Sequence, residues 1–353
     1  MKKRYIQSAW LTGLLIVWSC LSIGCSEQSE PDVPQGELLQ VSTLTRGMSD
    51  ALQEGVRIMI SPLLQTGEEA QGGYVTYAGK VGGKDTWNSG VYVDLDKQYL
   101  VYGFMPSDVV DRSSISAVMS GTSVTGATLR LMGVMALSDK DLCVVIGVGD
   151  GSSGNDVERG NFAYTPDYDS ESGLVKGISL LMDHLYASAS FKMKIDPFYN
   201  KLRTIKLKRL ALKCTDPNKG GKADVIITFK NGYTDPIGSI TTADVLDTGT
   251  AQLTLFEDAD GKELEEDVSV IDVTRNFLPT FASTLSLVST YDVYDKKGNK
   301  IRENCEATNS LGNVLGSISR GQVRPVVLTV NPTYLYVLSD PDLESPTVTV
   351  SQN

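Results

Sequence analysis

The chain has 353 residues, of which 41% are hydrophobic and 21% charged, a balance that is typical of globular proteins and unlike disordered or collagen-like chains. Its net charge of −11 disfavours general nucleic-acid binding, because an acidic surface repels phosphate groups. One histidine and five cysteines leave few side chains for a zinc enzyme or a histidine-dependent triad. We therefore expect no enzyme, no metal site and no cofactor, and the length favours two domains.

Residues 1–24 have the features of a signal peptide. Lys2, Lys3 and Arg4 form a basic start, and the apolar stretch 9–18 is too short to span a bilayer. The next run, Leu21-Ser22-Ile23-Gly24-Cys25, resembles the lipobox of bacterial lipoproteins, in which the cysteine carries a diacylglycerol and fatty acids such as palmitate. Cys25 is the expected lipidation site. The alternatives are lipidation at Cys20 and a plain secreted protein without a lipid anchor.

Most of the remaining chain carries strand signals. Apolar and polar residues alternate, or β-branched and aromatic residues cluster, over short runs separated by turn-like residues. These runs are 56–60, 73–77, 91–95, 99–104, 127–132, 142–146, 190–195, 204–212, 225–229, 252–256, 284–293, 326–330 and 334–338. Residues 96–98 predict a hairpin between the runs 91–95 and 99–104. The most helix-like segment is 174–186.

This pattern predicts an all-β chain with two antiparallel β-sandwich domains. The polar stretch 151–173 is expected to separate an N-terminal domain, residues 47–172, from a C-terminal domain, residues 173–330. Cys143 lies in an apolar run and is expected to be a core thiol. A disulfide bond between Cys214 and Cys305 is an open alternative. His184 is expected to be packed or hydrogen-bonded rather than catalytic.

Two motifs in this layout carry a family resemblance. The first begins at Trp87 and continues through the strands 91–95 and 99–104 to Met105-Pro106; the second is the stretch 181–193, which contains His184 and precedes the strand 203–207. In order with the lipobox and the tail, they resemble the fimbrillin family, including its Mfa-like branch. These proteins are lipoprotein-derived subunits of type V pili. The resemblance implies two transthyretin-like β-sandwich domains, processing by an arginine-specific protease, and polymerisation by donor-strand exchange.

The segment 25–46 resembles the tether and propeptide of such subunits. Residues 26–32 are polar and acidic, and residues 37–42 are a short strand candidate. Arg46 is the first basic residue after the leader, and Gly47 follows it, so the implied cleavage falls between Arg46 and Gly47. Cleavage there would remove a strand and leave neighbouring strand edges unpaired. The alternative is that Arg46 is an ordinary exposed arginine.

The C-terminal tail, residues 331–353, contains two extended runs split by a proline-bearing bend. They are the candidate donor strands that would complete the sheet of a neighbouring subunit. The alternative is an ordinary final hairpin within the C-terminal domain. The candidate residues are Tyr334, Leu335, Tyr336, Val337 and Leu338 in the first run, and Thr347, Val348, Thr349 and Val350 in the second.

The expected function is that of a structural subunit of a cell-surface fimbria, exported as an outer-membrane lipoprotein and assembled after cleavage. Its expected partners are other pilin subunits, the outer membrane through the lipid, and an arginine-specific protease; nucleic acid is not expected. The alternative function is a monomeric surface lipoprotein or pilus-tip adhesin that binds a host glycan or protein. The sequence leaves open the position in the pilus (stalk, anchor or tip), the receptor and the direction of strand exchange.

Overall fold

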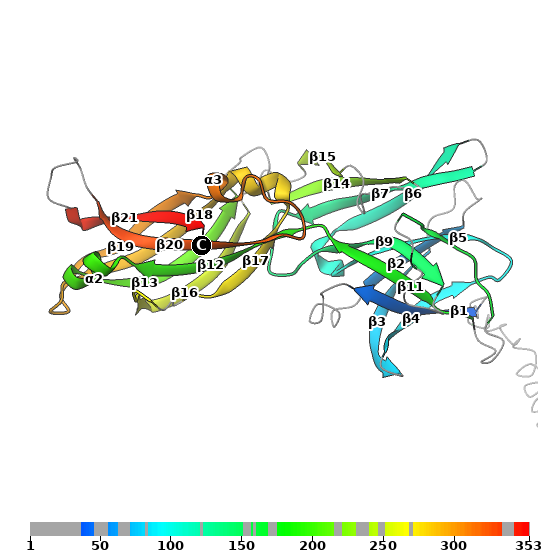
Figure 1. Cartoon of the computed structure of the whole chain (residues 1–353), viewed down its shortest axis with the longest axis horizontal. Helices are drawn as coiled ribbons and strands as arrows, with labels where there is room; N and C mark the ends of the chain where they lie inside the picture. The colour runs from blue at the N-terminus through cyan, green and yellow to red at the C-terminus, as the bar shows by residue number, and fades with distance from the viewer. Residues whose placement is uncertain are drawn as a thin grey trace, which may run out of the picture. The chain divides into compact units, whose positions relative to one another are not determined.

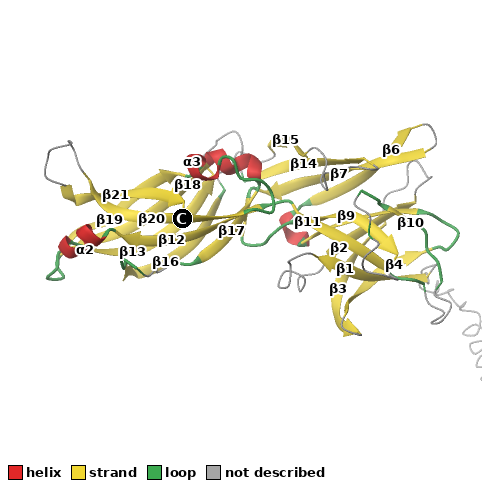
Figure 2. Ribbon diagram, viewed as in Figure 1, coloured by secondary structure: helices red, strands yellow, loops and turns green. Residues whose placement is uncertain are grey.

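The computed structural model describes residues 37–45, 56–62, 71–81, 84–120, 123–150, 157, 160–168, 175–214, 221–230, 240–245, 251–267, 271–333 and 342–352. Within these ranges the chain is built mainly from β-strands (Figure 1, Figure 2), which confirms the all-β fold class. The helical elements are short: η2 (Ser107–Val109), α2 (Pro197–Leu202), η3 (Pro279–Thr284) and α3 (Gly312–Leu315). No helix in the described part is long and apolar enough to cross a membrane.

The first sheet has eight strands in the order β10-β5-β2-β3-β4-β1-β11-β9. The strand β5 also pairs with β9, so the first strand of this order, β10, and the last, β9, are both neighbours of β5. Most pairs are antiparallel, but β1 and β11 run parallel. The bounds are β1 Glu37–Thr45, β2 Val56–Pro62, β3 Gln71–Val81, β4 Lys84–Val93, β5 Tyr99–Met105, β9 Cys143–Asp150, β10 Ala163–Tyr164 and β11 Ile178–His184.

Two sequence-based expectations fail in this sheet. The runs 91–95 and 99–104 do not form a hairpin, because β2 and β3 lie between β4 and β5. The helix-like segment 174–186 contains the strand β11 instead of a helix. Ile178, Ser179 and Leu180 are consecutive and all buried, so β11 is covered on both faces there. Its sequence has no strict alternation of apolar and polar residues by which a strand can be told from a buried helix.

The second sheet joins strands from distant parts of the sequence, in the order β15-β14-β7-β6. The strand β14 lies antiparallel beside β7, although the predicted boundary at residue 172 assigns them to different domains. The same boundary assigns β11 to the second domain, whereas β11 pairs within the first sheet. Strand order therefore does not follow the sequence-based division. The bounds are β6 Arg112–Ser120, β7 Ser123–Met135, β14 Lys222–Lys230 and β15 Ile240–Val245.

The third and fourth sheets have the orders β21-β20-β12-β17-β8 and β16-β13-β18-β19. Every second residue of β12 is buried, including Phe191 and Met193, and the buried Ile205 and Leu207 of β13 belong to the same apolar core. The bounds are β8 Leu137–Ser138, β12 Ala187–Ile195, β13 Thr204–Cys214, β16 Gln252–Glu263, β17 Val273–Phe277, β18 Leu285–Tyr294, β19 Lys300–Ser310, β20 Val323–Thr333 and β21 Asp342–Gln352.

The register of the fourth sheet excludes a disulfide bond between Cys214 and Cys305. Cys214 lies opposite Leu285 of β18, whereas Cys305 lies opposite Tyr291 of the same strand. Six residues along a strand span about 20 Å. A disulfide bond requires Cα atoms within about 7 Å of each other, so these two thiols are too far apart to pair.

A buried carboxylate stabilises the fourth sheet. Asp292 in β18 has a side chain that is 1% exposed, and its Oδ2 atom contacts the ammonium groups of Lys300 at 2.9 Å and Lys208 at 3.1 Å. It also accepts a hydrogen bond from the backbone N–H of Asn304 at 2.8 Å. Burial by itself raises the pKa of this carboxyl, but the bonds from Asn304, Lys300 and Lys208 together lower the pKa below its ordinary value.

Asp292→Asn is therefore expected to destabilise the chain in a pH-dependent way. Because the folded pKa lies below the unfolded one, the ionised carboxyl stabilises the fold at neutral pH, and this contribution is lost as the pH falls through the folded pKa. Urea unfolding at pH 7 should show a loss of about 2 kcal/mol, and the difference from wild type should shrink below about pH 4. The exposed Asp272 is the control, since Asp272→Asn should change stability by less than about 0.5 kcal/mol at either pH. An equal loss at both pH values would contradict the assignment.

Candidate assembly site

The strand β1 lies inside the first sheet, with a neighbour on each side. It pairs antiparallel with β4, where Val41 lies opposite Trp87, and parallel with β11, where Val41 lies opposite Ile178. The register with β11 continues to Thr45 opposite Met182. The expected strand at 37–42 is therefore confirmed, and it extends to Thr45. A strand in this position hydrogen-bonds to two neighbours, so its removal would leave two strand edges without a partner.

The strands on either side of β1 present apolar residues to the core. Val91 and Val93 in β4 are buried, and so are Ile178, Leu180 and Met182 in β11. If β1 left, the position between β4 and β11 would combine unpaired main-chain groups with buried apolar side chains. That combination is what an extended, alternating peptide recognises when it adds to a sheet.

The predicted processing residues lie outside the described part of the chain. They are Cys25, the expected lipidation site, and Arg46 and Gly47, the expected cleavage site. Arg46 directly follows Thr45, the last residue of β1. A cut after Arg46 would therefore separate the whole of β1 from the rest of the sheet, while the sheet itself would keep β2 and every later strand.

The described part of the C-terminal tail is a strand of the third sheet. β21 pairs antiparallel with β20, and its register places Val348 opposite Val330 and Val350 opposite Leu328. The candidate donor residues Thr347, Val348, Thr349 and Val350 all lie in this strand, with Val348 only 4% exposed. The other candidates, at 334–338, lie outside the described residues. The tail thus forms a final strand in its own chain, which is the arrangement of the ordinary hairpin alternative.

Side chains from the fourth sheet also hold β21. Three alternate carbonyls accept hydrogen bonds: that of Glu344 from Arg302, that of Pro346 from the Tyr291 hydroxyl, and that of Val348 from the Asn309 amide. Alternate carbonyls of a strand point to the same side, so these three bonds lie along one edge of β21. In the described part of the chain, side chains, and not another strand, hydrogen-bond to that edge. Two further bonds run from Tyr199 to the carbonyl of Leu343 and from Gln352 to that of Val314.

Asn309→Ala is expected to loosen β21. The substitution leaves the Val348 carbonyl without the Asn309 amide in a half-buried place, which should cost about 1–2 kcal/mol. Hydrogen exchange of the β21 amides should become faster, while exchange in β13 stays unchanged. Asn331→Ala is the matched control, because the Asn331 amide bonds the hydroxyl of Thr349 at an exposed place. Equal exchange rates in the two variants would show that the Asn309 bond does not hold the strand.

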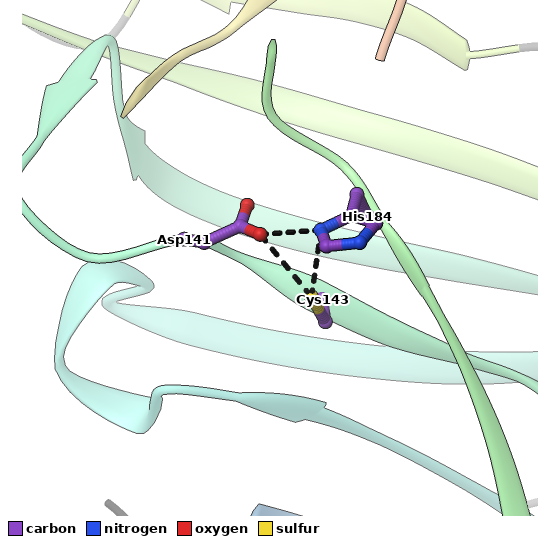
Figure 3. Close-up of side chains that lie close together, drawn as sticks. All are labelled: Asp141, Cys143 and His184. Carbon is purple, nitrogen blue, oxygen red and sulfur yellow. Dashed lines mark hydrogen bonds and ion pairs between the residues drawn. The ribbon is translucent and has the colours of Figure 1, made fainter. Parts of the chain in front are cut away.

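A second group of side chains meets where the first sheet connects to the third. Asp141 lies in the link between β8 and β9, Cys143 begins β9, and His184 ends β11 (Figure 3). The Nδ1 atom of His184 contacts the Asp141 carboxylate and lies 3.6 Å from the Cys143 sulfur. The expected core thiol at Cys143 is confirmed, since its side chain is 0% exposed, and His184 is hydrogen-bonded as expected.

The sequence pattern does not predict that these three residues lie together. The spacing of Asp141 and Cys143 puts them on one face of an extended chain, which is a local signal. Nothing local connects them to His184, which lies 41 residues after Cys143 and faces it only through the pairing of β9 with β11. The hydrogen bond that the His184 imidazole donates to the Asp141 carboxylate raises the pKa of His184. Burial, followed by the charges of Asp141 and Asp183, raises the pKa of the Cys143 thiol.

No protein-family model matches this chain, and no curated protein matches it. Among solved structures, a fimbrial protein from Bacteroides vulgatus is 14% identical, with a TM-score of 0.40, and the match covers 90% of this chain and 99% of that one. The fimbrial anchor protein Mfa2 from Porphyromonas gingivalis is 12% identical, with a TM-score of 0.30, and the match covers 90% of this chain and 97% of that one.

Proposed function

We propose that this chain is a structural subunit of a cell-surface pilus of the fimbrillin type, exported as an outer-membrane lipoprotein anchored at Cys25. An arginine-specific protease cuts after Arg46, β1 leaves the first sheet, and the tail of another subunit takes its place. The observation that carries the proposal is the position of β1: it lies between β4 and β11, and the candidate cleavage site directly follows it.

Cleavage changes the strength with which β1 is held. Before the cut, β1 and the rest of the sheet belong to one chain, so β1 rebinds at the high effective concentration of a tethered segment. After the cut, β1 is a separate strand that is lost by dilution. The strand edges of β4 and β11 are then open to another extended segment, which gains main-chain hydrogen bonds by pairing with them.

The donor is the tail, and it too is occupied before assembly. In its own chain, β21 pairs with β20, and its carbonyls accept hydrogen bonds from Arg302, Tyr291 and Asn309. In the described residues, an uncleaved subunit therefore has β1 in the acceptor position and β21 paired with β20. This arrangement favours a stable precursor, and assembly needs both the removal of β1 and the transfer of β21.

The bonds that hold β21 also favour a second candidate function. A tail that stays in its own sheet suits a monomeric surface lipoprotein or a pilus-tip adhesin that binds a host glycan or protein. The two candidates differ in the outcome of cleavage, because only the first requires the chains to join.

Treatment of the purified full chain with an arginine-specific protease tests the proposal. We expect a cut after Arg46, confirmed by mass spectrometry, followed by a shift from monomer to polymer in size-exclusion chromatography and by filaments in electron microscopy. Arg46→Lys keeps the positive charge but removes the cut, and it should leave a monomer. Complete cleavage that yields only stable monomers would contradict assembly and favour the second candidate.

A further inference from the structure

The cluster of Asp141, Cys143 and His184 has donor atoms that converge on one place. The Cys143 sulfur lies 3.6 Å from Nδ1 of His184 and 3.8 Å from Oδ2 of Asp141, and the carboxylate contacts the same Nδ1. The side chains point toward one another in Figure 3. The sheet fixes two of them, since Cys143 and His184 are directly opposite each other in the pair β9–β11.

A catalytic dyad or triad does not fit this geometry. In such a site, one ring nitrogen faces the nucleophile and the other faces the carboxylate that orients the ring. Here both the sulfur and the carboxylate contact Nδ1. The thiol is also completely buried, so a substrate has no access to it.

The carboxylate of Asp141 is only partly satisfied by the described residues. The second carboxylate oxygen of Asp141, Oδ1, is buried and has no hydrogen-bond partner among the described residues. Asp183 adds a second negative charge next to His184. The nearest lysine in sequence, Lys140, directs its ammonium group to Asp108 at 2.8 Å instead. A buried carboxylate oxygen without a partner is costly, and a bound cation is one way to satisfy it.

We propose that Asp141, Cys143 and His184 bind a single divalent transition-metal ion, with Zn²⁺ as the best match. Thiolate, imidazole and carboxylate are the three side-chain groups that Zn²⁺ takes as ligands. With bonds of about 2.3 Å to sulfur and about 2.1 Å to nitrogen, a tetrahedral ion holds these two ligand atoms about 3.6 Å apart. The observed separation of the Cys143 sulfur and Nδ1 of His184 is 3.6 Å.

Binding requires small and defined changes. The thiol proton leaves to solvent, and the proton on Nδ1 leaves or moves to Nε2, so that sulfur and Nδ1 each offer a lone pair to the metal. The contact between Asp141 and Nδ1 lengthens as the metal enters between them. The side chains of His184 and Asp141 are 30% and 22% exposed, so the ion arrives from their side and a water completes its coordination.

A metal ion bound here would connect two linker segments of the chain. Asp141 and Cys143 lie where the chain passes from β8 of the third sheet to β9 of the first, and His184 lies where it returns from β11 to β12. The single histidine of the chain predicts no metal site, but a mixed site needs only one histidine. The inference is independent of strand exchange and stands if the chain proves to be a monomer.

Titration of the untagged full chain with Co²⁺, which takes the same ligands as Zn²⁺, tests the proposal. One equivalent should produce a thiolate-to-cobalt charge-transfer band and the visible bands of tetrahedral cobalt, and Zn²⁺ should remove both. Cys143→Ser should lose the charge-transfer band, whereas Cys214→Ser, which changes another buried cysteine, should keep it. The partly exposed residues Asp141 and His184 give second variants that need not disturb the core. Asp141→Asn and His184→Gln should each weaken binding at least about tenfold and remove the rise in melting temperature that Zn²⁺ causes in the wild type. Absence of binding in the wild type, or a charge-transfer band that persists in Cys143→Ser, would overturn the proposal.

Discussion

A Val41→Pro chain is expected to polymerise with Arg46 uncut. Val41 lies opposite Trp87 on one side and Ile178 on the other, so its position in β1 has a strand on both sides. Proline lacks the N–H group and does not fit inside a central strand. The loss of one ladder bond, with its carbonyl left unpaired, costs about 2 kcal/mol, which lowers the equilibrium constant for the pairing of β1 in the sheet roughly thirtyfold. Light scattering and electron microscopy of the untreated chain would show the polymer.

The control for this variant is Val41→Thr, which keeps the N–H group and a β-branched side chain and should stay monomeric. Hydrogen exchange in β4 and β11 reports whether the proline has displaced β1, since the amides of both strands lose protection when their neighbour leaves. If these amides exchange quickly and the chain is still a monomer, an open β1 position is not sufficient for assembly, and the proposed mechanism is contradicted.

A Val348→Asp chain is expected to lose polymerisation after cleavage at Arg46. Val348 is 4% exposed in β21, whereas its neighbour Thr349 is exposed. Successive side chains of a strand point to opposite faces, so only Val348 enters the apolar interior of a sheet. A carboxylate there should lower the stability of the chain by about 3 kcal/mol and prevent the tail from packing on a neighbour.

Thr349→Asp is the matched control, with the same added charge one residue away. It should polymerise as the wild type does and change stability by less than about 0.5 kcal/mol. Mixing separates a donor defect from simple unfolding: a cleaved Val348→Asp chain still has an acceptor position, so adding it to wild-type subunits should shorten the filaments. Filaments of normal length from Val348→Asp alone would exclude β21 as the donor strand.

Several features of this chain could be predicted because they depend on near neighbours in sequence. The strand at 37–42 and the alternation in 346–350 follow from a period of two residues. The burial of Cys143 follows from the apolar run around it. The prediction of a helix over 174–186 was wrong for the complementary reason: a strand buried on both faces has no alternation of apolar and polar residues to detect.

Pairing between strands could not be predicted in this way. The runs 91–95 and 99–104 are close in sequence and still do not pair, because β2 and β3 lie between β4 and β5. Likewise, β14 pairs with β7 across a predicted domain boundary. Every residue type except proline offers the same main-chain hydrogen bonds, so the choice of partner depends on which apolar faces can be buried together.

Three features can be predicted from the amino-acid sequence: the protein is all-β, a strand precedes Arg46, and the tail is extended and alternating. The folded chain is needed to see that β1 lies between β4 and β11, that β21 is bound in its own chain, and that Cys143 faces His184. The two groups of features differ in the range of the interactions that produce them. Strand formation and side-chain alternation are set over a few residues, whereas the neighbours of a strand are set by packing between segments that lie far apart in the chain.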